Sequence, residues 1–142
     1  MMKKHVHLQL PSHTDYLDVI REFISKLANE AGFDEENVHK IALALDEACT
    51  NVIRHAYDGG DEKYVEVEAK VDRRGMTITV SDSGRGFDPD AIETPNIEKL
   101  LAQHKFGGFG LYIIKTVMDD VNFHIEPGVR NQVQMTKYFK KS

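Results

Sequence analysis

The chain has 142 residues, of which 41% are hydrophobic and 29% charged, a composition typical of one globular domain with a single core. Its net charge of -5 disfavours proteins that hold nucleic acid or an anionic membrane through a general positive field. No stretch approaches the roughly 18 apolar residues of a membrane span, and a single cysteine excludes an intrachain disulfide. We therefore expect one domain over residues 1–142, located in the cytoplasm, with no membrane or direct nucleic-acid partner.

A strand and a helix are predicted at the start of the chain. Apolar and polar residues alternate over 5–10, which is typical of a strand, and Pro11 ends it. Apolar residues then recur at helical spacing. Ser12 or Thr14 is expected to cap this helix, and Gly32 supplies a left-handed stop.

A second, longer helix is predicted from a cap at residue 34 to about His55, and Cys49 lies in its apolar stripe as a small buried hydrophobe. Glu47, Asn51 and His55 are four residues apart, so they follow one edge of the helix. An amide oxygen of Asn51 can ligate Mg²⁺, and Glu47 can deprotonate a hydroxyl. Taken alone, such a line of polar residues is more often a solvated helix face.

Two hairpins and a third helix are predicted in the remainder. Alternating segments at 64–71 and 76–81 form one hairpin, and segments at 121–125 and 133–138 form the other. Between them, helical spacing covers about 107–118. The sum is a two-layer α/β sandwich, with a mixed, mostly antiparallel sheet and helices on one face.

Two glycine clusters flank the least regular part of the chain. Asp82-Ser83-Gly84-Arg85-Gly86 follows a predicted strand, so its carboxylate could accept a hydrogen bond from the exocyclic amine of a purine. Gly107-Gly108-Phe109-Gly110 opens a predicted helix, whose free amides favour a phosphate. Each cluster alone is equally consistent with an ordinary turn. The pair predicts a nucleotide site.

Other familiar site patterns do not fit the sequence. There is no Gly-x-x-x-x-Gly-Lys-Ser/Thr loop, and no Gly-x-Gly-x-x-Gly opens a strand-helix-strand unit. His5 and His7 share one face of the first predicted strand, but no Cys/His set completes a zinc site. These histidines are therefore expected to be surface residues.

The order of the motifs is more specific than any one of them. Glu47-x-x-x-Asn51 on a helix, Asp82-x-Gly84-x-Gly86 after a strand and Gly108-x-Gly110 at a helix start together resemble the GHKL ATP-binding superfamily of gyrase, heat-shock chaperone, histidine kinase and MutL ATPases. More closely, residues 46–57 and Met135-Thr136-Lys137-Tyr138 resemble the bacterial anti-sigma factor serine kinases of partner-switching systems. The similarity covers nearly the whole chain.

This resemblance implies ATP bound with Mg²⁺ in the Bergerat fold. Asn51 would hold Mg²⁺, Glu47 would be the catalytic base and Asp82 would recognise adenine. Residues 88–106 correspond to the ATP lid of the family. The same resemblance places further nucleotide contacts at His55, Gly84, Gly86, Lys105, Gly107, Gly108, Gly110, Leu111 and Gln132.

Two segments depart from the pattern of close relatives. Those relatives often carry Gly-Thr-Thr-Val before the last strand, where this chain has Arg130-Asn131-Gln132-Val133, so a usual hydroxyl contact to the nucleotide is either absent or replaced by an amide. They also often carry arginine just before the second glycine cluster, where Lys105-Phe106 stands here. These differences bear on catalytic rate more than on nucleotide binding.

The resemblance also implies a function. It is that of an anti-sigma regulatory serine/threonine protein kinase, commonly a homodimer, which phosphorylates a small anti-sigma antagonist of the STAS type and sequesters a sigma factor. The alternative is an ATP-binding regulatory module that lacks kinase activity or acts on a partner other than a sigma factor.

Overall fold

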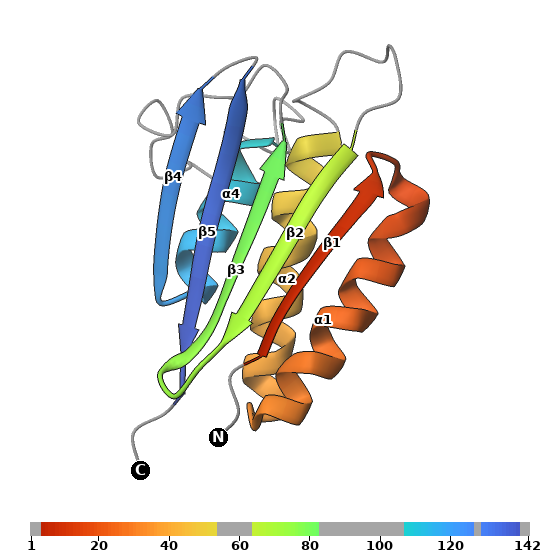
Figure 1. Ribbon diagram of the computed structural model, residues 1–142. Helices are drawn as coiled ribbons and strands as arrows, with labels where there is room; N and C mark the ends of the chain where they lie inside the picture. The colour runs from red at the N-terminus through yellow and green to blue at the C-terminus, as the bar shows by residue number, and fades with distance from the viewer. Residues whose placement is uncertain (1–3, 54–63, 83–106, 127–128, 140–142) are drawn as a thin grey trace.

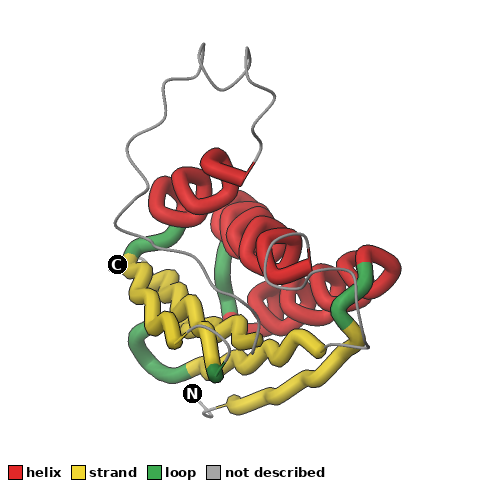
Figure 2. Tube along the Cα trace, turned by 90° about the horizontal axis from the view of Figure 1, so that it is seen from above, coloured by secondary structure: helices red, strands yellow, loops and turns green. Residues whose placement is uncertain are grey.

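The computed structural model describes residues 4–53, 64–82, 107–126 and 129–139. Within these ranges the chain forms two layers, a five-stranded sheet and the helices that cover one of its faces (Figures 1 and 2). The predicted two-layer α/β sandwich with helices on one face is thereby confirmed.

The sheet has the strand order β1-β2-β3-β5-β4. All four neighbouring pairs are antiparallel, so the parallel pairing implied by a mixed sheet is not found among the described strands. Both hairpins are present as predicted. The strands are β1 (Lys4–Pro11), β2 (Tyr64–Val71), β3 (Gly75–Asp82), β4 (Asp120–Glu126) and β5 (Arg130–Tyr138).

In the described part of the chain, three α-helices pack on this sheet: α1 (Leu17–Ala31), α2 (Glu35–Asn51) and α4 (Gly107–Val117). Gly32 ends α1 in the left-handed conformation, with φ 109°, as predicted. The cap predicted for the second helix is also present, because Asp34 Oδ1 accepts a hydrogen bond from the Asn37 amide at 2.9 Å. The α-helix ends at Asn51 and continues as a π-helix through residues 52–53, and the predicted limit at His55 lies outside the described residues.

The predicted cap of the first helix is wrong. A short 3₁₀ turn, η1 (Thr14–Tyr16), precedes α1, and His13 Nδ1 accepts from the Asp15 amide at 3.1 Å. The α-helix then begins after Tyr16 without a side-chain cap. The chain reverses from β1 into α1 through this tighter turn, so neither Ser12 nor Thr14 occupies the capping position.

The core lies between the helices and the face of the sheet that they cover, here called the inner face. Alternation along each strand puts apolar side chains on this face and polar ones on the other. The helices contribute fully buried residues, among them Ile24, Ile41 and Ile114. Cys49 is also fully buried, as predicted. No helix in the described part of the chain is long and apolar enough to span a membrane.

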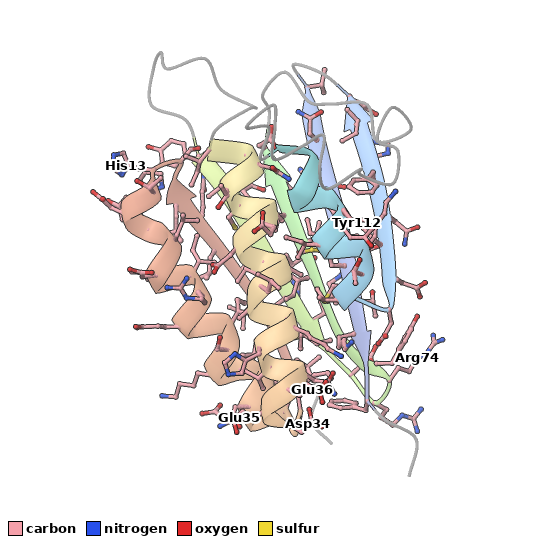
Figure 3. The ribbon with its side chains drawn as sticks, turned by 180° about the vertical axis from the view of Figure 1, so that it is seen from behind. His13, Asp34, Glu35, Glu36, Arg74 and Tyr112 are labelled. Carbon is pink, nitrogen blue, oxygen red and sulfur yellow. The ribbon has the colours of Figure 1, made fainter. Side chains whose placement is uncertain are left out.

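The segments that carry the predicted site lie at one end of the sandwich, opposite the start of α2. Asp34, Glu35 and Glu36, at the start of α2, lie at the same end as Arg74 in the β2–β3 turn (Figure 3). The end of α2 therefore lies at the opposite end, together with the end of β3, the start of β5 and the start of α4 (Figure 1).

Candidate functional site

The predicted catalytic edge of α2 lies on the side of that helix away from α1. Helix α2 packs between α1 and α4 (Figure 3). Asp46 faces α1, because its Oδ2 accepts from Arg21 Nη1 at 2.8 Å. Successive residues of an α-helix are about 100° apart around its axis. Around α2, the stripe of buried residues therefore has Asp46 on one side and Glu47 and Asn51 on the other side, toward α4. Both side chains are half-buried.

Asp82 lies at the end of the inner face of the sheet. It is paired in register with Asn131 of β5, and Asn131 Nδ2 donates to Asp82 Oδ1 at 3.0 Å. Asn131 is only 2% exposed, whereas Asp82 is half-buried. This hydrogen bond orients the Asp82 carboxylate, a group that only accepts hydrogen bonds and has about four acceptor positions.

Gln132 does not join this cluster. Consecutive residues of a strand point to opposite faces, and Gln132 is paired in register with Ser81 on the outer face of the sheet. Its amide lies 3.2 Å from Ser81 Oγ. In the amide orientation that satisfies both groups, its Oε1 also accepts from Arg130 Nε at 2.8 Å. Gln132 thus lies on the face of the sheet opposite Asp82, whereas Asn131 lies beside it, and the contact of Gln132 with a nucleotide stays a prediction.

The second glycine cluster forms the first turn of α4. The helix begins at Gly107, so Gly108, Gly110 and Leu111 follow within its first five residues. The first amides of an α-helix have no partner within the helix, and they point toward a ligand at its N-terminus. Glycines at three of these positions leave the backbone uncovered, which suits close approach by a phosphate.

The remaining predicted contacts fall outside the described residues. They are His55, Gly84, Gly86, Lys105 and the predicted lid at 88–106. The described part of the site thus consists of four pieces at one end of the sandwich: the edge of α2, Asp82, Asn131 and the start of α4 (Figure 1).

Comparison with protein families identifies this arrangement. Residues 10–137 match the family model of the histidine kinase-like ATPase domain, and the match includes all four pieces of the site. The chain belongs to the histidine kinase-like ATPase domain family. Members of this family use ATP, which agrees with the nucleotide site predicted from the two glycine clusters.

Within this family, the chain is similar to the serine-protein kinases named RsbW. It is 33% identical to the one from Listeria monocytogenes, over 99% of this chain and 90% of that protein. It is 34% identical to the one from Halalkalibacterium halodurans, over 96% of this chain and 84% of that protein. The matches to these two proteins therefore cover most of both chains.

A solved structure gives the same fold. The crystal structure of RsbU and RsbW domains from a Mycobacterium tuberculosis protein matches 98% of this chain with a TM-score of 0.70 at 16% identity. The match covers 34% of that longer chain. At this identity the likeness supports the histidine kinase-like ATPase fold alone.

The residues present fit a metal held jointly with a ligand. No group of three His, Cys, Asp or Glu side chains that could hold a metal ion occurs among the described residues. Mg²⁺ usually takes one or two protein oxygens and completes its shell with phosphates and water. The amide oxygen of Asn51, the last residue of α2, suits that role in this ATPase domain.

Cys49 takes no part in this chemistry, although it lies two residues before Asn51. Desolvation by burial, with a smaller contribution from the charge of Asp46, raises the pKa of its thiol to about 12. The thiolate is the nucleophilic form of cysteine, and at neutral pH this residue is a thiol.

Asn131 lies beside Asp82 in the structure, but the sequence prediction did not single it out. Its position could have been found from the alternation of the last strand, in which Val133 and Met135 are buried. Residues two apart in a strand share a face, so Asn131 extends that buried face and Gln132 does not.

Proposed function

We propose that this chain is a regulatory serine/threonine protein kinase that transfers the γ-phosphoryl group of ATP to a hydroxyl of a partner protein. The observation that carries the proposal is that the end of α2, the end of β3, the start of β5 and the start of α4 lie at one end of the sandwich, where Asp82 and Asn131 are hydrogen-bonded. The similarity to proteins named serine-protein kinases supports protein as the acceptor. The catalytic domain in this proposal spans residues 1–142.

Recognition of the base is proposed to depend on Asp82. An ionised carboxylate only accepts hydrogen bonds, so it favours a purine with an exocyclic amine at the facing position. Asn131 holds one carboxylate oxygen, which fixes the direction of the other. A base with a carbonyl at that position would leave the carboxylate without its donor, and such mismatches cost about 1–3 kcal/mol.

The phosphates are proposed to lie at the start of α4, with Mg²⁺ held by Asn51. The amides of Gly107, Gly108 and Gly110 would donate to phosphate oxygens. When bound, Mg²⁺ would neutralise the negative charge of the phosphate oxygens in the transition state of the transfer. His55, Gly84, Gly86 and Lys105 complete the proposed contacts, with residues 88–106 as the lid.

Glu47 is proposed as the base. The bond between the γ-phosphorus and the β–γ bridging oxygen breaks, and a bond from that phosphorus to the acceptor hydroxyl oxygen forms. The hydroxyl proton passes to the Glu47 carboxylate, and ADP leaves. Such transfer depends mainly on alignment and charge stabilisation, which a helix edge and a helix start can provide.

The partners are proposed by similarity to the RsbW kinases. The acceptor would be an anti-sigma antagonist of the STAS type, and the unphosphorylated antagonist would compete with a sigma factor for this chain. A homodimer in the cytoplasm is the proposed working form. No role in binding nucleic acid or a membrane is proposed.

Incubation with ATP labelled at the γ-phosphate, Mg²⁺ and a candidate antagonist tests the proposal. Label is expected on a serine or threonine of the antagonist, and removal of Mg²⁺ by EDTA should abolish it. Binding of both ATP and the antagonist without transfer would instead indicate a binding module.

A further inference from the structure

Lys137 is a buried cation on the inner face of β5. The residue is 8% exposed and pairs in register with the fully buried Met76. A charged side chain in such a place is costly unless it is paired and hydrogen-bonded. Lys137 Nζ donates to the Val117 carbonyl at 2.8 Å and lies 3.6 Å from Asp119 Oδ1.

These partners belong to the end of α4 and the turn that follows it. Val117 is the last residue of the helix, so its carbonyl is one of the four that have no partner within the helix. A cation is also favoured there by the helix dipole. Lys137 therefore supplies both the missing donor and a charge of the favourable sign.

Other groups at the end of β5 fasten the same turn. The Asp119 amide donates to the Thr136 carbonyl at 2.9 Å, and the Tyr138 amide donates to Asp119 Oδ2 at 2.7 Å. The Tyr138 hydroxyl donates to Asp120 Oδ2. The segment Thr136-Lys137-Tyr138 thus holds the junction between α4 and β4, and Lys137 makes the contact to the helix itself.

We infer that Lys137 is a positioning residue that fixes α4 along its own axis. Apolar packing at Ile114 and Met118 resists separation of α4 from the core but has no direction along the helix. A hydrogen bond to the last carbonyl is directional and sets that axial position.

The axial position of α4 matters because its other end bears the proposed phosphate site. From its end at Lys137, α4 runs back toward the start of β5 (Figure 1). Its 11 residues span roughly 16 Å. Asn131 lies six residues before Lys137 on the same inner face, roughly 20 Å along the strand. Strand β5 therefore carries both Asn131, beside the proposed base site, and Lys137, which sets the position of the proposed phosphate site through α4. This consequence rests on the proposed function.

The test compares Lys137→Met with Lys137→Arg and Ile24→Val. Methionine removes the donor and the charge with little change in volume, while arginine retains both. Ile24 is fully buried in α1, on the far side of α2, so Ile24→Val perturbs the core without contacting this junction. Both measurements are made under conditions in which every variant is folded. They are the hydrogen exchange of the α4 amides without nucleotide and the dissociation constant of ATP in the presence of Mg²⁺.

For Lys137→Met we expect α4 amide exchange to accelerate about tenfold and the ATP dissociation constant to rise about tenfold. Lys137→Arg should restore most of both, and Ile24→Val should change neither by more than about twofold. Unchanged α4 exchange in Lys137→Met overturns the inference. Faster α4 exchange in Lys137→Met, with an ATP affinity equal to that of Ile24→Val, would mean that Lys137 contributes only to stability. That result also overturns the positioning role.

Failure of the proposed function gives a different result. If the wild-type chain binds no ATP, the nucleotide site is wrong, and the exchange data still decide whether Lys137 holds α4. Should Lys137→Met fail to fold, Asp119→Asn removes the neighbouring charge and keeps an oxygen for the Tyr138 amide. If the α4 amides exchange at the wild-type rate in Asp119→Asn and stay protected in Lys137→Arg, the hydrogen bond to Val117 is the contact that holds α4. Loss of protection in Lys137→Arg would contradict this.

Discussion

Asn131 Nδ2 donates to Asp82 Oδ1 at 3.0 Å, joining the start of β5 to the end of β3 on the inner face of the sheet. One partner is nearly fully buried and the other is half-buried. The hydrogen bond therefore connects the core to the proposed base-binding carboxylate. It defines the orientation of that carboxylate before any ligand arrives.

Replacing Asn131 should weaken nucleotide binding more than replacing its neighbour Gln132. Asn131→Ala removes the donor that orients Asp82, and hydrogen bonds to charged groups contribute about 1.5–3 kcal/mol. We expect the ATP dissociation constant to rise by about tenfold or more in calorimetric titration.

Gln132→Ala is the matched control, because Gln132 lies one residue away on the outer face. Its ATP affinity should stay within about twofold of wild type. Asn131→Thr, which restores a hydroxyl donor, should recover part of the loss. A larger effect of Gln132→Ala than of Asn131→Ala would favour the sequence-based prediction of Gln132.

The buried thiol of Cys49 should make stability depend on pH in the alkaline range. Its pKa is raised from 9.0 to about 12, so above about pH 9 the unfolded thiol loses a proton that the folded one retains. Stability is thus full below pH 9 and falls by about 1.4 kcal/mol per pH unit toward pH 12.

Urea unfolding of wild type and Cys49→Ala at about pH 7.5 and pH 10.5 isolates this effect from other titrating groups. The stability difference between the two proteins should shrink at the higher pH. In the native state at neutral pH, iodoacetamide should leave Cys49 unmodified. An unchanged difference, or rapid alkylation, would show that the thiol is not held in an apolar environment.

Two glycines should differ in what alanine costs. A Cβ built at Gly75 would lie 2.0 Å from the Lys137 backbone oxygen, so Gly75→Ala forces β3 and β5 apart. At Gly32, with φ 109°, no atom lies within 4 Å of such a Cβ, and only backbone strain remains. Denaturant unfolding should give losses of about 3 kcal/mol for Gly75→Ala and about 1 kcal/mol for Gly32→Ala. Equal losses of stability in the two variants would mean that the β5 backbone shifts to accommodate the Cβ added at Gly75.

Most of the fold follows from local patterns. Alternation predicted both hairpins, and helical spacing predicted the three α-helices, because each pattern reports which face of an element is buried. Gly32 and Asp34 marked helix ends through backbone geometry and a side-chain cap. The start of α1 was mispredicted because its turn is set by the path from β1, and two equally plausible capping residues precede it.

The site was predicted in part. The Glu47 and Asn51 edge and the glycine start of α4 follow from spacing along single helices. Gln132 was predicted from a family pattern, which fixes a segment of the chain but not the face of the sheet on which each residue lies. Strand alternation settles that point once the register of β5 is known.

Contacts between distant segments could not be predicted from the sequence. The Met-Thr-Lys-Tyr segment was recognised as a family feature, but nothing local indicates that Lys137 reaches Val117. The pairing of Arg21 with Asp46 likewise depends on how α1 lies against α2. Such contacts depend on how elements far apart in the sequence pack together.

The central claim is that Glu47 acts on the acceptor hydroxyl, and the rate of phosphoryl transfer to an antagonist protein in Glu47→Gln tests it most directly. Asp46→Asn is the control, since Asp46 is the adjacent residue on the α1 side of α2. Loss of a general base typically costs about 10²–10⁴-fold in rate, and we expect a loss of that size in Glu47→Gln with ATP affinity retained. Asp46→Asn should transfer at close to the wild-type rate. Transfer by Glu47→Gln at the wild-type rate would contradict the account.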